Sequence, residues 1–415
     1  MARRTVLVVV AGGILFLGAA LIFLTRQTAP TPMKILISLP GWEDMEWFTS
    51  AVACTVEIVS EERQPKFAAK GRSLEFITIY TAEETDRDST TAEREKILPV
   101  IEGDAAILAV WGAGSSGEAR NTIPVLNEVP IALVSSFATS PGLTKSSYDR
   151  PGEPLIYYPS GRRTFFRVVP DDDMQGVVAT RWLNQEGYKR VFIIAQENAY
   201  SAGLTGILEA NAADYNLEIV GKEVITPSAL SEDDLNALAE RVLAKNPQVI
   251  FYPASMDKSF AVIDALRRRN PTIPVLGGDG LIVETLPAER ALLEGVYATN
   301  VSPPIDKVEG AAGLVKTYTE RWGKTPGCSP KQPTTIAKPP DFVLPVYEAL
   351  SVMAHALETA DEPTRIGVLR TLQNLGEYEG LTGTWKFDAN GDITLATINL
   401  MQIQNGEWVS VRIIR

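Results

Sequence analysis

The chain has 415 residues, of which 45% are hydrophobic and 22% charged, so it is long enough to build two hydrophobic cores. Its formal net charge of -12 argues against a partner bound through phosphates, because such binding depends on clustered Lys and Arg. We therefore expect a folded globular protein with no nucleic-acid partner.

The chain begins with an uncharged, apolar segment from Thr5 to Thr25, preceded by Arg3 and Arg4. About 21 residues are enough to cross a bilayer as a helix. Because no A-x-A-like site follows the segment, we favour an uncleaved transmembrane anchor over a cleaved signal peptide. Arginines on the amino-terminal side place the rest of the chain outside the cytoplasm.

Short apolar segments alternate with helical patterns through most of the remaining chain. Strands are expected at 34–39, 74–80, 105–111, 131–135, 191–195, 218–225, 249–252, 273–276 and 295–301. Helices are expected at 43–57, 91–102, 172–186, 202–214, 231–245 and 258–269. This alternation predicts parallel sheets covered by helices.

The carboxyl-terminal part differs in character. Helical patterns at 341–360 and 364–372 are followed by strand patterns at 394–403 and 408–414. Asn405-Gly406 lies between the two strand patterns and predicts a tight hairpin turn.

The chain has two cysteines and one histidine. Cys54 and Cys328 lack a C-x-x-C neighbour, so they cannot form a zinc or iron-sulfur cage. We interpret them as unpaired thiols, with a disulfide in an oxidising compartment as the alternative. His355 lies in a helical pattern and is interpreted as a packed or surface residue.

Residues 112–117 form a G-x-G-x-x-G motif directly after a predicted strand. Dinucleotide binding also requires an acid at the end of the next strand, and none is present there, so we expect no cofactor. The same residues resemble a nucleophile elbow, which leaves open a serine hydrolase using Ser115 and His355. Alternatively, hydroxyls and backbone N–H groups at a helix start can hold a carboxylate.

Two further loops follow predicted strands, where ligands bind in open parallel sheets. Residues 135–141 supply hydroxyl groups, and residues 277–280 place Asp279 between glycines. Residues 388–392 resemble part of a calcium loop but lack the distal glutamate of an EF-hand, so they predict a tight turn.

The order and spacing of these segments resemble the type I periplasmic binding proteins, in particular the leucine/isoleucine/valine-binding receptors of ABC importers. The matching landmarks are 112–117, 136–141, 165–176, Tyr200, 277–280 and 387–392. The resemblance implies an α/β fold of two Rossmann-like lobes joined by three hinge crossovers near Pro170, Val301 and Ala396. Its expected divisions are an anchor or signal and linker at 1–32, lobe 1 at 33–169 and 302–396, and lobe 2 at 170–301 and 397–415.

The resemblance also implies a ligand-binding set without catalytic or metal-binding residues. Ser116 and the loop at 137–139 would hold a ligand carboxylate through hydroxyls and backbone groups. Asp279, the only acid in the matched strand-end loops, would meet the ligand ammonium. The full expected set is Trp42, Ser116, Phe137, Ala138, Thr139, Tyr200, Ser255 and Asp279.

The function implied is that of a non-enzymatic, periplasmic or otherwise extracytoplasmic receptor. It would close on a small amino-acid or amide ligand and deliver it to an ABC permease, held at the cytoplasmic membrane by its N-terminal helix. A membrane-tethered sensor or activator of the same fold is the alternative, because one fold serves many functions.

Overall fold

The computed structural model describes residues 29–40, 46–81, 90–146, 150–255, 258–283, 286, 290–330, 336, 338–395 and 397–414. The predicted membrane anchor, Trp42 and the expected crossover residue Ala396 lie outside these residues. Within the described ranges, no helix combines the length and apolar character needed to cross a membrane.

The first sheet consists of five parallel strands in the order β2-β1-β3-β4-β5. Its strands are β1 (Thr31–Pro40), β2 (Arg72–Thr81), β3 (Ile107–Trp111), β4 (Ala132–Ser135) and β5 (Phe165–Arg167). Every residue of β3 and β4 is buried, as expected for parallel strands covered on both faces. One face packs against α2 (Glu46–Ala68), α10 (Val343–Thr359) and α11 (Arg365–Gln373), and the other against α3 (Thr90–Gly103) and α4 (Ser116–Glu128).

The second sheet has seven strands in the order β14-β13-β10-β9-β8-β6-β7. Its parallel strands are β6 (Arg190–Gln196), β7 (Glu218–Ile225), β8 (Val249–Phe251), β9 (Val275–Gly277) and β10 (Tyr297–Asn300). The antiparallel hairpin of β13 (Ile398–Gln404) and β14 (Glu407–Ile414) completes the sheet. Its two faces are covered by α5 (Asp172–Gln185) with α6 (Ala199–Asn211), and by α7 (Glu232–Leu243) with α8 (Ser259–Arg269).

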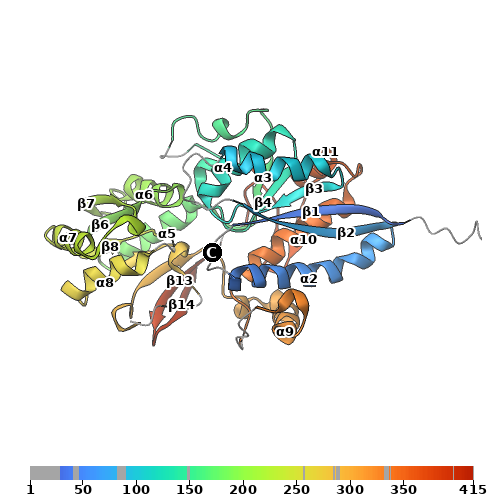
Figure 1. The fold of residues 1–415 in the computed structure, drawn as a ribbon. Coiled ribbons are helices and arrows are strands. Elements are labelled where there is room, and N and C mark those ends of the chain that lie inside the picture. The colour runs from blue at the N-terminus through green and yellow to red at the C-terminus, as the bar shows by residue number, and fades with distance from the viewer. Residues whose placement is uncertain are drawn as a thin grey trace, which may run out of the picture.

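We call the first sheet with its helices lobe 1 and the second sheet with its helices lobe 2. Figure 1 shows the lobes side by side, with the C-terminal end of the chain between them. The chain passes between the two sheets after β5, after β10 and before β13. Between the last two crossings, α9 (Ala312–Arg321), α10, α11, β11 (Tyr378–Gly380) and β12 (Gly383–Trp385) add to lobe 1. An α/β fold of two lobes with three crossings is therefore confirmed.

The structure departs from the predicted elements in a few places. α2 continues eleven residues beyond the predicted end, through Pro65, because its apolar side chains pack against lobe 1. β5, a strand of three residues, was not predicted. Asn405 and Gly406 have φ angles of 55° and 74°, so the predicted hairpin turn is confirmed.

The interpretation of the two cysteines as unpaired thiols is wrong. Cys54 and Cys328 form a disulfide that joins α2 to the segment after α9. Both residues are fully buried beside Tyr318 and Ile305. Because 274 residues separate the two cysteines, they meet only through tertiary packing, in which α9 and the turn that carries Cys328 lie against α2.

Candidate ligand-binding site

The loop that starts α4 is held by its own side chains. Ser115 is the N-cap, and its hydroxyl accepts a hydrogen bond from the N–H of Glu118 at 3.1 Å. The Glu118 carboxylate in turn accepts from the N–H of Gly114 at 2.7 Å. This reciprocal cap occupies backbone donors that an anionic ligand would otherwise use.

The loop after β4 is braced in a similar way. The Ser135 hydroxyl accepts hydrogen bonds from the N–H groups of Phe137 and Ala138 at 3.1 and 3.0 Å. Ser116, the first residue of α4, accepts at its hydroxyl from the N–H of Ser140 at 3.0 Å. The two lobe 1 loops are therefore tied into one rigid unit.

Phe137 points into an aromatic cluster of lobe 1. Its ring centroid lies 5.5 Å from that of Phe48, 6.1 Å from that of Trp111 and 6.2 Å from that of Phe342. Because Phe137 remains partly exposed, the cluster presents an apolar, aromatic wall beside the loop.

Arg167, the last residue of β5, stabilises the loop after β4. Its fully buried guanidinium donates to the carbonyls of Ala138 and Ser140 at 3.1 and 2.9 Å. Its Nε donates to Asp392 Oδ1 at 2.7 Å, and the Thr144 hydroxyl donates to Asp392 Oδ2 at 2.9 Å. Burial raises the pKa of Asp392, but the charge of Arg167 together with the hydrogen bonds from Arg167 and Thr144 outweighs burial and holds that pKa below its ordinary value.

Asp172 lies where the two lobes meet. Its backbone N–H donates to the carbonyl of Thr139 at 2.9 Å, which links the start of α5 to the lobe 1 loop. The side chain is fully buried, and among the described residues neither carboxylate oxygen has a hydrogen bond of ordinary geometry, although the nearby Thr139 hydroxyl acts to lower its pKa. The hydroxyls of Thr139 and Ser140 are also buried without a partner. Burial first, and the negative charge of Asp279 second, raise the pKa of Asp172 well above its ordinary value.

Asp279 approaches the same place from lobe 2. Its Oδ1 accepts from the Tyr200 hydroxyl at 2.8 Å and from Gln175 Nε2 at 2.6 Å. Burial raises the pKa of Asp279 to about 6. A Cβ at Gly278 would lie 2.1 Å from the Tyr200 hydroxyl, so a glycine is required there for this approach.

The charges at this junction are unbalanced. The described part of the chain places these charged groups around the start of α5: the cations Arg167 and Lys145, and the carboxylates Asp171, Asp172, Asp173, Asp279 and Asp392. Arg167 binds Asp392 at 2.7 Å, while Lys145 binds Asp171 at 2.5 Å and Asp173 at 2.7 Å. The N-terminal end of α5 favours a nearby anion by only about 0.3–1 kcal/mol. Asp172 and Asp279 therefore lie close enough for their charges to interact, and no described cation is paired with either of them.

The lobes touch around this acidic pair. A Cβ at Gly203 of α6 would lie 3.5 Å from Ser140 Oγ and 3.7 Å from Asp172 Oδ2. α6 also packs directly against α4. The strand-end loops of both lobes thus converge, which is where ligands bind in parallel α/β sheets.

Most of the predicted binding residues lie at this junction. Thr139, Tyr200 and Asp279 surround Asp172, and Ser116 joins them through Ser140. Ala138 contributes its backbone to the braced loop, whereas the ring of Phe137 packs into the aromatic cluster. Ser255 lies beside Gly280, and its hydroxyl donates to Gln196 Oε1 at 2.7 Å.

Sequence reasoning missed three residues of this site: Asp172, Gln175 and Ser140. It also treated Asp279 as the only acid, which is wrong because Asp172 is a second one. The available signal was the run of three acids at 171–173 before a helix. The sequence does not show which of the three acids belongs to the site, because they differ in their burial in the folded protein.

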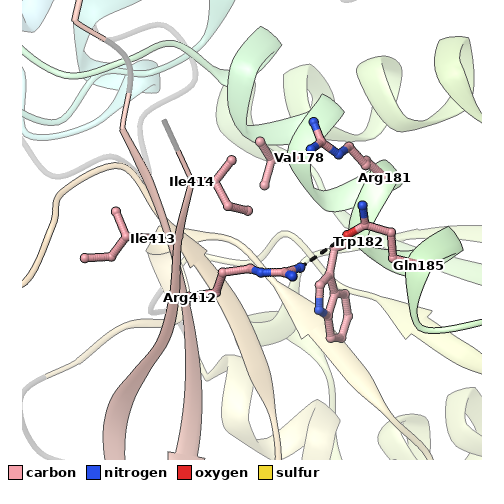
Figure 2. Close-up of a pocket in the computed structure, with 7 residues that line it drawn as sticks. All are labelled: Val178, Arg181, Trp182, Gln185, Arg412, Ile413 and Ile414. Atoms are coloured by element: carbon pink, nitrogen blue, oxygen red, sulfur yellow. Dashed lines mark hydrogen bonds between the residues drawn. The ribbon is translucent and has the colours of Figure 1, made fainter.

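A separate pocket of about 290 Å³ lies between α5 and β14 in lobe 2 (Figure 2). Trp182 and Val178 form its apolar floor, and Arg412 Nη1 donates to Gln185 Oε1 at 3.2 Å across its rim. None of the predicted binding residues line it, so it is distinct from the acidic junction.

The pairing of Ser115 with His355 that a hydrolase requires does not form. Ser115 caps α4, and the ring of His355 packs edge-on against Tyr378 at a centroid distance of 5.5 Å. The first turn of α10 contacts the strand-end loops, where Ser136 donates to the carbonyl of Pro345. At 1.5 Å per residue, His355 lies about 15 Å further along that helix.

The predicted calcium-like segment is a tight turn, as expected. Asp388 Oδ1 accepts hydrogen bonds from the N–H groups of Asn390 and Asp392 at 2.8 and 3.0 Å. In the part of the chain that the structure describes, no group of three potential metal ligands occurs.

Two α/β lobes, three crossings and a polar site where their strand ends meet define the class of two-lobed binding proteins. Residues 67–407 match the periplasmic binding protein family, so the chain belongs to this family and the resemblance seen in the sequence is confirmed. It is 24% identical over 315 residues to the Leu/Ile/Val-binding protein BraC3 of Rhizobium johnstonii, covering 75% of this chain and 76% of that protein.

Solved structures show the same fold. The leucine-binding protein LivK of Thermotoga maritima has a TM-score of 0.72 and 20% identity, covering 92% of this chain and 98% of LivK. A solute-binding protein of an ABC transporter from Rhodopseudomonas palustris, in complex with 3,4-dihydroxybenzoic acid, has a TM-score of 0.70 and 13% identity, covering 92% and 97%.

Proposed function

We propose that this protein is an extracytoplasmic receptor that closes on a small ligand carrying a protonated amine, of which an amino acid is the simplest case. The observation that carries the proposal is the pair Asp172 and Asp279, two carboxylates at the lobe junction without a cation of their own. A bound ammonium group supplies the missing charge and several hydrogen-bond donors.

The ligand class follows from the charge of the junction. Similar folds serve different ligands, since one relative is named a leucine-binding protein and another holds a dihydroxybenzoic acid. An aromatic acid without an amine would bring a further negative charge beside Asp172 and Asp279. Two like charges repel strongly where water is scarce, so an amine is favoured over a simple acid.

The two lobes take different roles in this proposal. Asp279, held by Tyr200 and Gln175, and Asp172 bind the ammonium group. The hydroxyls of Thr139 and Ser116 bind the ligand carboxylate on the lobe 1 side, and Trp42 and Ser255 border the ligand. The partly exposed ring of Phe137 contacts the apolar part of the ligand.

Delivery to an ABC permease and tethering by residues 5–25 complete the proposal. The Cys54–Cys328 disulfide supports a location outside the reducing cytoplasm. Membership in a family of binding proteins supports a non-enzymatic role, and the separation of Ser115 from His355 leaves the hydrolase alternative unsupported. No observation favours the sensor alternative.

A thermal-shift screen of amino acids, their amides, small amines and aromatic acids tests the function. A ligand at one hundred times its dissociation constant stabilises the folded state by about 2.7 kcal/mol, which is easily measured. We expect stabilisation by one or more compounds that carry an amine. Stabilisation by aromatic acids alone would contradict the proposed ligand class.

A further inference from the structure

The surroundings of Asp172 at the acidic junction determine whether its carboxyl group is protonated. Asp172 is fully buried, and in the described part of the chain neither of its oxygens has a hydrogen bond of ordinary geometry; the neighbouring Thr139 hydroxyl lowers its pKa but does not offset the effect of burial. A carboxylate in that position loses its hydration and gains too little in exchange, which strongly disfavours its charged form. The neutral acid avoids most of this loss.

The cations near Asp172 in the described part of the chain are already paired with other carboxylates. From β5, Arg167 acts on Asp172, but its guanidinium is bound to Asp392. From the start of α5, Asp171 adds a negative charge that Lys145 neutralises. From the segment after β9 comes the like charge of Asp279, and α6 contributes the neutral Tyr200. The lobe 1 loop offers only the hydroxyls of Thr139 and Ser140.

We propose that ligand binding at this junction is a proton exchange, in which the ligand ammonium displaces a proton held by Asp172 when the lobes are closed. The O–H bond of the Asp172 carboxyl group breaks and its proton passes to solvent. The ammonium group then donates hydrogen bonds to the carboxylates of Asp172 and Asp279. This inference rests on the proposed function, because it assigns the amine of the ligand to this pair.

The raised pKa of Asp172 agrees with this geometry and fixes the direction of the effect. The ligand-free protein binds more protons than the complex, so affinity rises with pH until Asp172 is ionised without ligand. Below that pKa, affinity falls by up to about tenfold for each pH unit, which corresponds to one proton exchanged.

The first test needs no ligand. Infrared spectra of the full chain at neutral pH are compared between the wild type and Asp172→Asn. A protonated carboxyl band that the variant lacks is expected. The matched control is Asp173→Asn, because Asp173 is partly exposed and bound to Lys145 at 2.7 Å, and it should leave the band in place. A wild-type spectrum without a protonated carboxyl band assignable to Asp172 would overturn the proposal.

The second test uses L-leucine as the probe and isocaproate, the same carbon skeleton without the amine, as its control. Calorimetry of the wild type in two buffers of different ionisation enthalpy counts the protons released. We expect about one proton per L-leucine bound, and fewer for Asp172→Asn. L-Leucine binding without proton release would overturn the exchange.

The two tests separate the exchange from the proposed function. If the protonated band is present but isocaproate binds and L-leucine does not, the amine-binding function fails while the protonation of Asp172 stands. If Asp172→Asn does not fold, the two-buffer measurement on the wild type still decides whether a proton leaves.

Discussion

Two buried acidic clusters lie next to each other in this protein, and they differ in one respect. Asp392 is bound by Arg167 at 2.7 Å and its pKa is lowered. Asp172 is more deeply buried and lies near the carboxylate of Asp279, and its pKa is raised. A carboxylate that is paired inside the protein stabilises the fold, whereas one left unpaired is stabilised when a cationic ligand arrives.

The largest effect on the free energy of unfolding is expected when the ion pair of Arg167 and Asp392 is broken. Arg167→Met leaves Asp392 buried without its cation, and breaking a buried pair costs about 3–5 kcal/mol. Urea denaturation measures the loss. The control is Arg94→Met, because Arg94 pairs with Glu128 on the exposed surface and should cost at most about 1 kcal/mol. Equal losses in the two variants would contradict the assignment of Arg167 as a structural residue.

The next effect falls on ligand affinity rather than on folding. Asp279→Ala removes a charge-assisted hydrogen bond worth about 1.5–3 kcal/mol, so binding weakens by about tenfold to over a hundredfold. Titration calorimetry with an amine ligand measures the change. An unchanged affinity would remove the amine-binding interpretation of this cluster.

The pH dependence of folding distinguishes the two clusters further. The folded-state pKa of Asp172 is raised, so the folded protein binds more protons and Asp172 lowers stability as pH rises above about 4, the unfolded value. Each unit of that rise in pKa is worth about 1.4 kcal/mol. Asp172→Asn should therefore gain stability relative to the wild type as pH increases, measured by denaturation at several pH values. A constant difference would show that Asp172 titrates normally.

Asp392 behaves in the opposite sense. Its folded-state pKa is lowered, so its contribution to stability is present above about 4 and is lost as pH falls through the folded value. Asp392→Asn should lose stability relative to the wild type at neutral pH, and the difference should shrink in acid.

The smallest effect is expected for a hydroxyl on the lobe 1 side. Thr139→Val keeps the shape of the side chain but removes one hydroxyl donor; a hydrogen bond to a charged group is worth about 1.5–3 kcal/mol, and the Ser116 hydroxyl still binds the ligand carboxylate. Affinity should fall by less than it does for Asp279→Ala, as measured by the same calorimetry. A loss larger than that of Asp279→Ala would move the main binding contribution from lobe 2 to lobe 1.

Much of the fold was predictable because it follows from local patterns. The buried strands of both sheets are apolar runs, and β7 begins and ends at the predicted residues. The turn at Asn405-Gly406 is fixed by the two residues themselves, since both must adopt positive φ. The disulfide was not predictable, because no local pattern relates Cys54 to Cys328.

The sequence by itself determined the two-lobed α/β fold, the strand-end loops and the presence of acids within them. It placed three consecutive acids at the start of a helix without distinguishing them. Tertiary structure decided that Asp171 caps α5, that Asp173 pairs with Lys145 on the surface, and that Asp172 is buried against lobe 1. The protonation and pairing of a carboxylate depend on its solvent exposure and on neighbouring charges. The charge that acts on Asp172 comes from Asp279, which is 107 residues further along the chain, so only the tertiary structure brings the two together.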